Sequence, residues 1–405
     1  MRVSPLPKRY SALLLTILLW GTALTGCADA AFPPWETLWS NYQQYFIDGQ
    51  GRVVDANHGG RSISEGQAYA LFFALVANQP QTFARILQWT QNNMARGDLA
   101  RHLPAWLWGR NAQGLWGVLS SRSASDADLW IAYTLLEAGR LWHNTKYTAL
   151  GLQMARMVAH DELISVPNWG PILLPGPSPY WHAGGRIITN PSYLPLFILL
   201  ALGKALPDGP WSVMAAHLPK FMAAVASQGT APGWIAYRPG TGWEMAPEGS
   251  NGGYDAIRCY LWGGGMTNAH SPGAQALLDA LGGMAGYLRT HGIPPLSVNT
   301  LSGIDTGEAP IGFSAALLPY LSRLDQIHAY AQQSARLNNA LDRRTLLYSQ
   351  HYYANNLTLF ALGMMEGAYS FTPEGALRVR WQGQSNAWDP LHLRLLADNE
   401  KNSAS

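Results

Sequence analysis

The chain has 405 residues and carries little charge: 27 Lys and Arg stand against 25 Asp and Glu, a formal net charge of +2. Charged residues make up 13% and hydrophobic residues 48% of the chain, whereas an average soluble domain has about 25% charged residues. This composition excludes a mainly disordered chain.

The first 26 residues predict an export signal. Three basic residues, Arg2, Lys8 and Arg9, precede an apolar run from 12 to 20, which is too short for a mature transmembrane helix. Leu24-Thr25-Gly26-Cys27 follows and has the pattern of a bacterial lipoprotein signal. We therefore expect residues 1–26 to be removed and Cys27 to be lipidated, giving an exported, periplasmic lipoprotein. Ordinary cleavage near Ala28-Asp29-Ala30 is the alternative.

The remaining chain offers no recognisable cofactor or metal site. Removal of residues 1–26 takes away three basic side chains, so 24 basic against 25 acidic residues leave a charge of −1. Such a near-neutral protein has no electrostatic surface for nucleic acid. A lipidated Cys27 would leave Cys259 without a disulfide partner. The histidines show no ligand spacing typical of a metal site, and no nucleotide-binding motif is present. We expect no cofactor and a monomer.

Helical periodicity dominates the chain after the signal, and some helices are apolar on every side, which is typical of buried helices. Helices are predicted at 66–78, 81–96, 126–142, 149–160, 193–206, 211–226, 254–263, 272–291, 312–324, 325–338 and 355–368. Short strands are predicted near Ile187-Ile188 and at 377–381, and long Gly- and Pro-rich connections at 171–186, 238–253 and 294–310. The pattern predicts one all-α domain at 27–396, built as a toroid of helical hairpins, and a polar tail at 397–405.

Three of the few acidic positions stand where a polar segment meets an apolar helix. Glu65 directly precedes such a run, and Ser62 or Ser64 could form a capping box there, so a structural role competes with that of a general acid. The helix dipole favours an ionised Glu65, so burial and a second carboxylate would have to raise its pKa. If these helix starts converge, they could supply the two carboxyl groups that glycoside hydrolysis needs.

A structural and a functional interpretation also compete for each of Asp126, Asp128 and Asp255. Asp126 and Asp128 could favour the first turn of a helix capped by a serine, but residues two apart point about 200° away from each other. One of them therefore faces the interior, where it needs a partner. Asp255 and Arg258 have the spacing of a surface ion pair on a helix.

Aromatic residues are abundant, with 17 Trp and 18 Tyr. Trp106 and Trp108 lie in a weakly patterned stretch and could stack on sugar rings. Core packing is the alternative for each of them.

Several motifs, in order along the chain, resemble glycoside hydrolase family 8. They are Ser64-Glu65-Gly66-Gln67, Trp89-Thr90-Gln91-Asn92-Asn93, Leu103-Pro104-Ala105-Trp106-Leu107-Trp108-Gly109, Ser123-Ala124-Ser125-Asp126-Ala127-Asp128, Asn190-Pro191-Ser192-Tyr193-Leu194-Pro195, Tyr254-Asp255-Ala256-Ile257-Arg258 and Gly312-Phe313-Ser314-Ala315-Ala316. The resemblance runs from about Trp35 to about Tyr369. It implies an (α/α)6 barrel and an inverting endo-β-1,4-glucanase.

The resemblance also implies roles for individual residues. Glu65 would be the proton donor and Asp255 the base that activates water. Asp126 matches the signature aspartate and would bind and distort the sugar. Arg258 and Tyr193 match residues near the cleavage point. Trp106, Trp108 and Asp128 are further candidates for substrate binding.

The family further suggests a cellulose or β-glucan chain as substrate and a cellulose synthase complex as partner. Two alternatives stay open: a non-catalytic glucan-binding lipoprotein, and a chitosanase or xylanase of the same fold. Intact Glu65 and Asp255 favour an enzyme. A scarcity of acids argues against chitosan, whose ammonium groups would attract extra carboxylates.

Overall fold

A computed structural model describes residues 32–178, 181–249, 251–266, 271–341 and 352–382. The predicted signal peptide, Cys27 and the tail at 397–405 lie outside these residues. The described helices are α1 (Trp35–Phe46), α2 (Ser64–Val76), α3 (Pro80–Met94), α4 (Ser125–Leu141), α5 (Thr145–Asp161), α6 (Leu196–Ala205), α7 (Trp211–Val225), α8 (Ile257–Gly265), α9 (Ala274–Ala280), α10 (Gly282–His291), α11 (Ile311–Arg323), α12 (Ile327–Ala340) and α13 (Tyr352–Met365).

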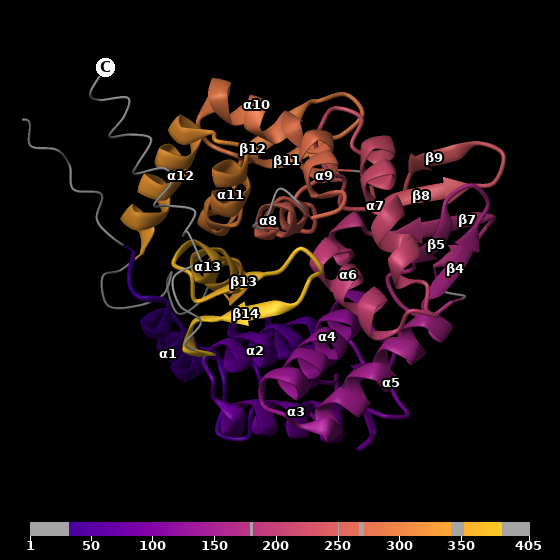
Figure 1. Cartoon of the computed structure of the whole chain (residues 1–405), viewed down its shortest axis with the longest axis vertical. Helices are drawn as coiled ribbons and strands as arrows, with labels where there is room; N and C mark the ends of the chain where they lie inside the picture. Colours follow the sequence, from indigo (N-terminus) through magenta and orange to yellow (C-terminus); the bar gives the residue numbers. More distant parts are fainter. Residues whose placement is uncertain (1–31, 179–180, 250, 267–270, 342–351, 383–405) are drawn as a thin grey trace, which may run out of the picture. The chain divides into compact units, whose positions relative to one another are not determined.

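The helices form two concentric rings, an (α/α)6 barrel, as predicted (Figure 1). The inner helices are α2, α4, α6, α8, α11 and α13. Helix α2 packs on α4, α4 on α6, α8 on α11, α11 on α13, and α13 on α2. Phe197 of α6 lies edge-on to Trp262 of α8, at 6.2 Å between ring centroids, and so closes the ring. The outer helices α3, α5, α7, α9, α12 and α1 each pack on one inner helix.

The inner helices are buried on all sides because their sequences are apolar all round. In α2 and α4 nearly every residue is buried, which confirms the interpretation of 126–142 as a buried helix. Gly264 of α8 allows a close approach to α11, because a Cβ at this position would collide with the backbone at Pro319 and Tyr320. The first turns of α2, α4 and α8 meet at one end of the barrel, where Arg258 bonds to Glu65 and to Asp126.

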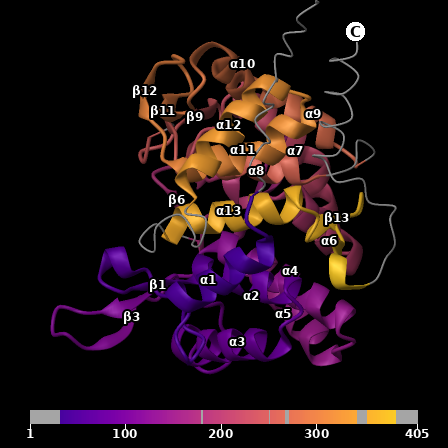
Figure 2. The same cartoon turned by 90° about the vertical axis from the view of Figure 1, so that its left-hand side faces the viewer.

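Short strands lie in the connections between the helices. They are β1 (Ser62–Ile63), β2 (Leu107–Arg110), β3 (Trp116–Ser120), β4 (Leu163–Val166), β5 (Gly170–Leu173), β6 (His182–Ala183), β7 (Arg186–Thr189), β8 (Ile235–Arg238), β9 (Gly242–Met245), β10 (Asn251–Gly252), β11 (Pro295–Asn299), β12 (Asp305–Glu308), β13 (Tyr369–Phe371) and β14 (Leu377–Val379). The hairpin that ends in β3 extends beyond the helices (Figure 2).

Antiparallel pairing builds these strands into small sheets of two to four strands. Strand β1 pairs with β2 in a register that sets Ser62 opposite Trp108. Because α2 starts at Ser64, this sheet holds the segment that leads into the helix of Glu65.

Several predictions of elements need correction. Helix α1 was not predicted. The helix predicted at 272–291 is broken at Leu281 into α9 and α10. Helix α8 begins at Ile257, so Asp255 lies in the turn before it. The strand predicted near Ile187 is confirmed as β7. Of the strand predicted at 377–381, Leu377–Val379 form β14, whereas Arg380–Gln382 form a 3-10 helix. The connections predicted as loops contain strands: β9 and β10 lie within 238–253, and the hairpin β11–β12 lies within 294–310.

Candidate active site

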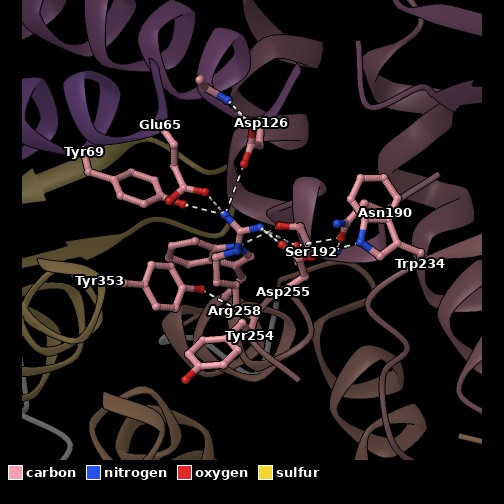
Figure 3. A network of polar contacts seen from close by, with 12 residues as sticks. Glu65, Tyr69, Asp126, Asn190, Ser192, Trp234, Tyr254, Asp255, Arg258 and Tyr353 are labelled. Atoms are coloured by element: carbon pink, nitrogen blue, oxygen red, sulfur yellow. Dashed lines mark hydrogen bonds and ion pairs between the residues drawn. The ribbon is translucent and has the colours of Figure 1, made fainter. Parts of the chain in front are cut away.

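Arg258 is the centre of a buried polar cluster at the N-terminal end of the inner helices (Figure 3). Its side chain is only 2% exposed. Nη1 donates to a carboxyl oxygen of Glu65 and, at 3.1 Å, to Oδ2 of Asp126. Nη2 donates to Oδ1 of Asp255 at 2.8 Å. The structure therefore brings together four residues singled out in the sequence, from positions 65, 126, 255 and 258.

Glu65 lies in a setting that favours its protonated form. Burial raises the pKa of Glu65 to about 8, Arg258 opposes this rise, and Asp126 and Asp255 add to it. Like charges nearby disfavour ionisation. Glu65 therefore keeps its proton at neutral pH and can donate it.

Asp255 has more hydrogen-bond donors around it than Glu65 has. It is also the most exposed acid of the cluster, at 35%. Burial raises its pKa, while Arg258, Trp234 and Asn190 lower it. Trp234 donates its Nε1–H to Oδ2 of Asp255 at 3.0 Å. Hydrogen bonds to a carboxylate favour its ionised form, so these partners oppose the effect of burial.

The serines next to these acids do not cap the helices, contrary to the competing interpretation. Helices α2 and α4 begin without a side-chain cap. The hydroxyl of Ser62 donates to the carbonyl of Val53 at 2.6 Å, and that of Ser125 donates to the carbonyl of Leu174, also at 2.6 Å. The serines thus tie the helix starts to neighbouring segments. The Asp255–Arg258 pair exists, but it is part of the buried cluster rather than a surface pair.

Asp128 is not part of the cluster around Arg258. It is completely buried, like Glu162, with which it interacts. A side chain without exposed surface cannot touch a substrate, so the structure gives no support to Asp128 as a substrate-binding residue. The expectation that one of Asp126 and Asp128 faces inward is met by Asp128, although Asp126 is also buried.

Tyr193 lies beside the cluster, with its ring centroid 5.5 Å from Cζ of Arg258. The half-buried Trp106 connects two of the helix starts through its backbone: its carbonyl accepts from the N–H of Ser64 at 3.1 Å, and its N–H donates to the carbonyl of Arg122 at 2.7 Å.

Trp108 is stacked on another tryptophan. Its ring centroid lies 5.1 Å from that of Trp116, at an interplanar angle of 14°. Cζ of Arg52 lies 4.4 Å from the ring centroid of Trp108. The half-buried indole of Trp108 thus packs against Arg52 and against Trp116, which is exposed, and its contact with substrate stays a prediction.

Sequence reasoning missed some members of the cluster. Tyr69 accepts from Nη1 of Arg258 at 3.2 Å, and Ser192 accepts from Nη2 at 3.0 Å. The position of Tyr69, one helical turn after Glu65, was a usable signal. Ser192 stands beside Tyr193 in one of the quoted motifs. Trp234 stands in none of them, and no pattern pointed to it.

A pocket of about 290 Å³ adjoins the cluster. Its wall includes Ile63, two residues before Glu65, and Tyr254, next to Asp255. Phe313 and Tyr353 add aromatic surface, and Asp55 adds a carboxyl group. Aromatic walls with a few polar groups are typical of binding sites for small molecules.

Two kinds of feature are absent from the described residues. No group of three or more His, Cys, Asp and Glu side chains among them is arranged to hold a metal ion. None of the helices in this part of the chain combines the length and the hydropathy that crossing a bilayer requires.

A helical barrel that sets a protonated carboxyl group near a hydrogen-bonded carboxylate has the arrangement that acid–base hydrolysis of glycosidic bonds uses. The chain belongs to the glycosyl hydrolases family 8, whose family model matches residues 6–367.

Relatives and solved structures agree with this assignment. An endoglucanase of Xanthomonas axonopodis pv. citri (strain 306) is 42% identical over 365 residues, which are 89% of this chain and 94% of the relative. An endoglucanase of Salmonella typhi is 38% identical over 369 residues, covering 91% of this chain and 96% of the relative. The crystal structure of endo-1,4-D-glucanase from Vibrio fischeri ES114 matches with a TM-score of 0.78 and 36% identity, over 85% of this chain and 99% of that one.

Proposed function

We propose that this protein is an endo-acting glycoside hydrolase that cleaves β-1,4-glucan, such as cellulose, with inversion at the anomeric carbon. The observation that carries the proposal is the cluster around Arg258, which joins Glu65, Asp126 and Asp255 through one buried guanidinium. The family assignment and the endoglucanases among the relatives support the substrate class.

Glu65 acts as the general acid. Its pKa of about 8 leaves it protonated at neutral pH, so it can give a proton to the glycosidic oxygen as the bond to the anomeric carbon breaks. A general acid contributes about 10²–10⁴-fold to the rate.

Asp255 acts as the general base. It takes a proton from a water molecule while the water oxygen attacks the anomeric carbon from the opposite face of the sugar. After one turnover Glu65 is ionised and Asp255 is protonated, so both must exchange protons with solvent. The larger exposure of Asp255, 35% against 15% for Glu65, gives water access to it.

Asp126 binds and distorts the sugar at the cleavage point. Arg258 and Tyr193 lie beside that point and position the groups around it. The aromatic pocket beside the cluster offers apolar faces for neighbouring sugar rings. Tyr254, whose side chain belongs to the pocket wall, is 56% exposed and is held through its carbonyl, which accepts from the hydroxyl of Tyr353 at 2.6 Å.

A parallel assay of reducing sugar release tests the proposal. The protein without residues 1–26 is incubated with carboxymethylcellulose, xylan and chitosan. We expect release from carboxymethylcellulose at a rate at least about tenfold above that from the other two, a discrimination within the reach of substrate pockets. Faster release from xylan or chitosan would assign a different substrate. No release from any of the three would favour a non-catalytic glucan-binding protein.

The matched variant is Glu65→Gln, which keeps the shape of the side chain but has no proton to transfer. We expect a loss of activity of about 10²-fold or more, with binding to cello-oligosaccharides retained. Activity within about tenfold of the wild type, in a folded variant, would contradict the role of Glu65.

We further propose that the protein works in the periplasm as a lipoprotein anchored through Cys27 and accompanies cellulose synthesis and export, with a cellulose synthase complex as its partner. The support is the lipoprotein signal pattern at Leu24-Thr25-Gly26-Cys27 and the resemblance described above.

A further inference from the structure

A second pair of acids, Asp128 and Glu162, lies near Asp126 but outside the cluster around Arg258. Asp128, on the first turn of α4, and Glu162, directly after α5, are both 0% exposed. The two carboxyl groups are near enough for each to change the pKa of the other. A hydrogen bond between them needs a proton on one of the two, because a carboxylate has no hydrogen to donate.

The surroundings do not supply the missing hydrogen. Both carboxyl oxygens of Asp128 and Oε2 of Glu162 are buried without a hydrogen-bond partner among the described residues. Only Oε1 of Glu162 has one, the hydroxyl of Ser123 at 2.5 Å. Two ionised carboxylates buried with a single donor would be costly, so this setting favours a proton on one of them.

The charges around the pair also favour a bound proton. Asp126 on α4 raises the pKa of both acids, and Asp161 at the end of α5 raises the pKa of Glu162. The segment from 174 to 176, which packs against the start of α4, consists of Leu, Pro and Gly and offers no titratable side chain. Burial, the largest effect, raises the pKa of Asp128 and of Glu162.

The pair joins the parts of the fold that hold Asp126. Glu162 is fixed at its backbone, where its carbonyl accepts from the N–H of Leu174 at 2.8 Å. Ser125, the residue before Asp126, donates its N–H to the carbonyl of Pro175 at 3.1 Å. Since α4 begins without a side-chain cap, these contacts and the acid pair set the position of its first turn.

We propose that Asp128 and Glu162 share one proton and act as positioning residues, which hold the start of α4 so that Asp126 meets Arg258. The proposal rests on the function proposed above for Asp126. It adds a bond between α4 and the end of α5 that exists only while the proton is bound.

A pair of substitutions at Glu162 tests the proposal. Glu162→Gln replaces the shared proton by a permanent amide donor toward Asp128 and keeps an acceptor for Ser123. Glu162→Ala removes the bond. We expect Glu162→Ala to lower kcat by at least about tenfold, because small displacements at an active site can cost about 10²-fold, with KM within about threefold of the wild type. Glu162→Gln should restore kcat to within about threefold of the wild type. A folded Glu162→Gln variant that is as impaired as Glu162→Ala would overturn the positioning role, and so would wild-type kcat in both variants.

The stability of the unliganded protein tests the shared proton independently of catalysis. The native pair binds a proton that the unfolded chain releases above about pH 4.3, so the free energy of unfolding of the wild type should fall as the pH rises from that value toward the raised pKa. Glu162→Gln should show a smaller fall in its urea midpoint between about pH 5 and pH 9. Equal falls in the two proteins would exclude the shared proton. This measurement tests the shared proton even if Glu162→Ala does not fold or the protein hydrolyses none of the glucans.

Discussion

At the scale of single residues, charge balance around Arg258 governs the chemistry. One guanidinium faces Glu65, Asp126 and Asp255, so three ionised carboxylates would leave an excess of buried negative charge. Burying unpaired charge is costly, and the cluster lowers this cost by keeping a proton on one acid. Glu65 is the acid whose pKa is raised to about 8. The excess of carboxyl groups over cations thus produces the general acid.

The pH dependence of hydrolysis should report this balance. Activity requires Glu65 protonated and Asp255 ionised, so kcat/KM should form a bell that falls on its alkaline side near pH 8, the pKa of Glu65. Asp126 raises that pKa. In Asp126→Asn the residual activity should therefore lose its alkaline limb at a lower pH, by about one unit, which corresponds to about 1.4 kcal/mol. The measurement is kcat/KM against pH for both proteins.

The direction of the shift is the decisive point of this comparison. An alkaline limb that stays in place or moves to higher pH in Asp126→Asn would mean that a group other than Glu65 produces it. The acidic limb should persist in the variant, because Asp255 keeps its donors Trp234 and Arg258.

The sequence predicted the acids of the cluster and Arg258, but not how the cluster is supported. Glu65 and Asp255 stand in recognisable motifs. The serines near Glu65 suggested a capping box because local spacing is all that a sequence shows, whereas Ser62 bonds to Val53 across a turn. Trp234 reaches Asp255 from 21 positions away, and no local pattern encodes such a contact.

At the scale of elements, close packing of the inner helices should make two adjacent glycines respond differently to substitution by alanine, as measured by the free energy of unfolding. A Cβ at Gly264 would collide with the backbone of α11, but a Cβ at Gly263 would meet only the side chains of Leu278 and Leu281, at an ordinary 3.4 and 3.8 Å. Gly264→Ala should lower the free energy of unfolding by about 1–3 kcal/mol, the usual cost of overpacking. Gly263→Ala should leave it unchanged or raise it by up to about 1 kcal/mol, since glycine weakens a helix.

Urea unfolding of the two variants and the wild type measures this difference. The glycines are neighbours in α8, so helix propensity affects both alike. Equal stabilities of the two variants would contradict the close approach of α8 and α11.

Helices were easier to predict than strands because apolar periodicity extends over many residues in a helix. The missed helix α1 carries this signal, since its buried residues Trp35, Leu38, Trp39, Tyr42 and Phe46 follow helical spacing. The hairpins β2–β3 and β11–β12 have short strands with exposed residues, so alternation is weak. Gly282-Gly283 at the start of α10 marks the break in the helix predicted at 272–291.

At the scale of the whole molecule, closure of the barrel makes the active site possible. Glu65 and Arg258 are 193 positions apart in sequence, yet they bond. The sequence could predict a toroid because several helices were apolar nearly all round, but it could not show which helix ends meet. That information lies in the packing of the inner helices on one another.

The proposed export and lipid anchoring concern the whole chain. If Cys27 is lipidated, the full-length protein expressed in a Gram-negative host should fractionate with membranes, because an acyl chain and a diacylglycerol together give stable anchoring. In Cys27→Ser the membrane-bound form should disappear. A wild-type protein found in the soluble periplasm with an N-terminus near Ala31 would show ordinary cleavage instead.

The stereochemistry of the first product tests the central claim most directly. Inversion needs a water between base and sugar, with acid and base carboxyl groups about 6.5–9.5 Å apart, whereas retention needs about 5–5.5 Å. Proton NMR during early turnover of a cello-oligosaccharide distinguishes the two outcomes. With Glu65 as acid and Asp255 as base, the new reducing end should appear first as the α-anomer and then mutarotate. If the β-anomer appears first, Asp255 does not activate water, and a carboxylate closer to Glu65, such as Asp126, must act as a nucleophile.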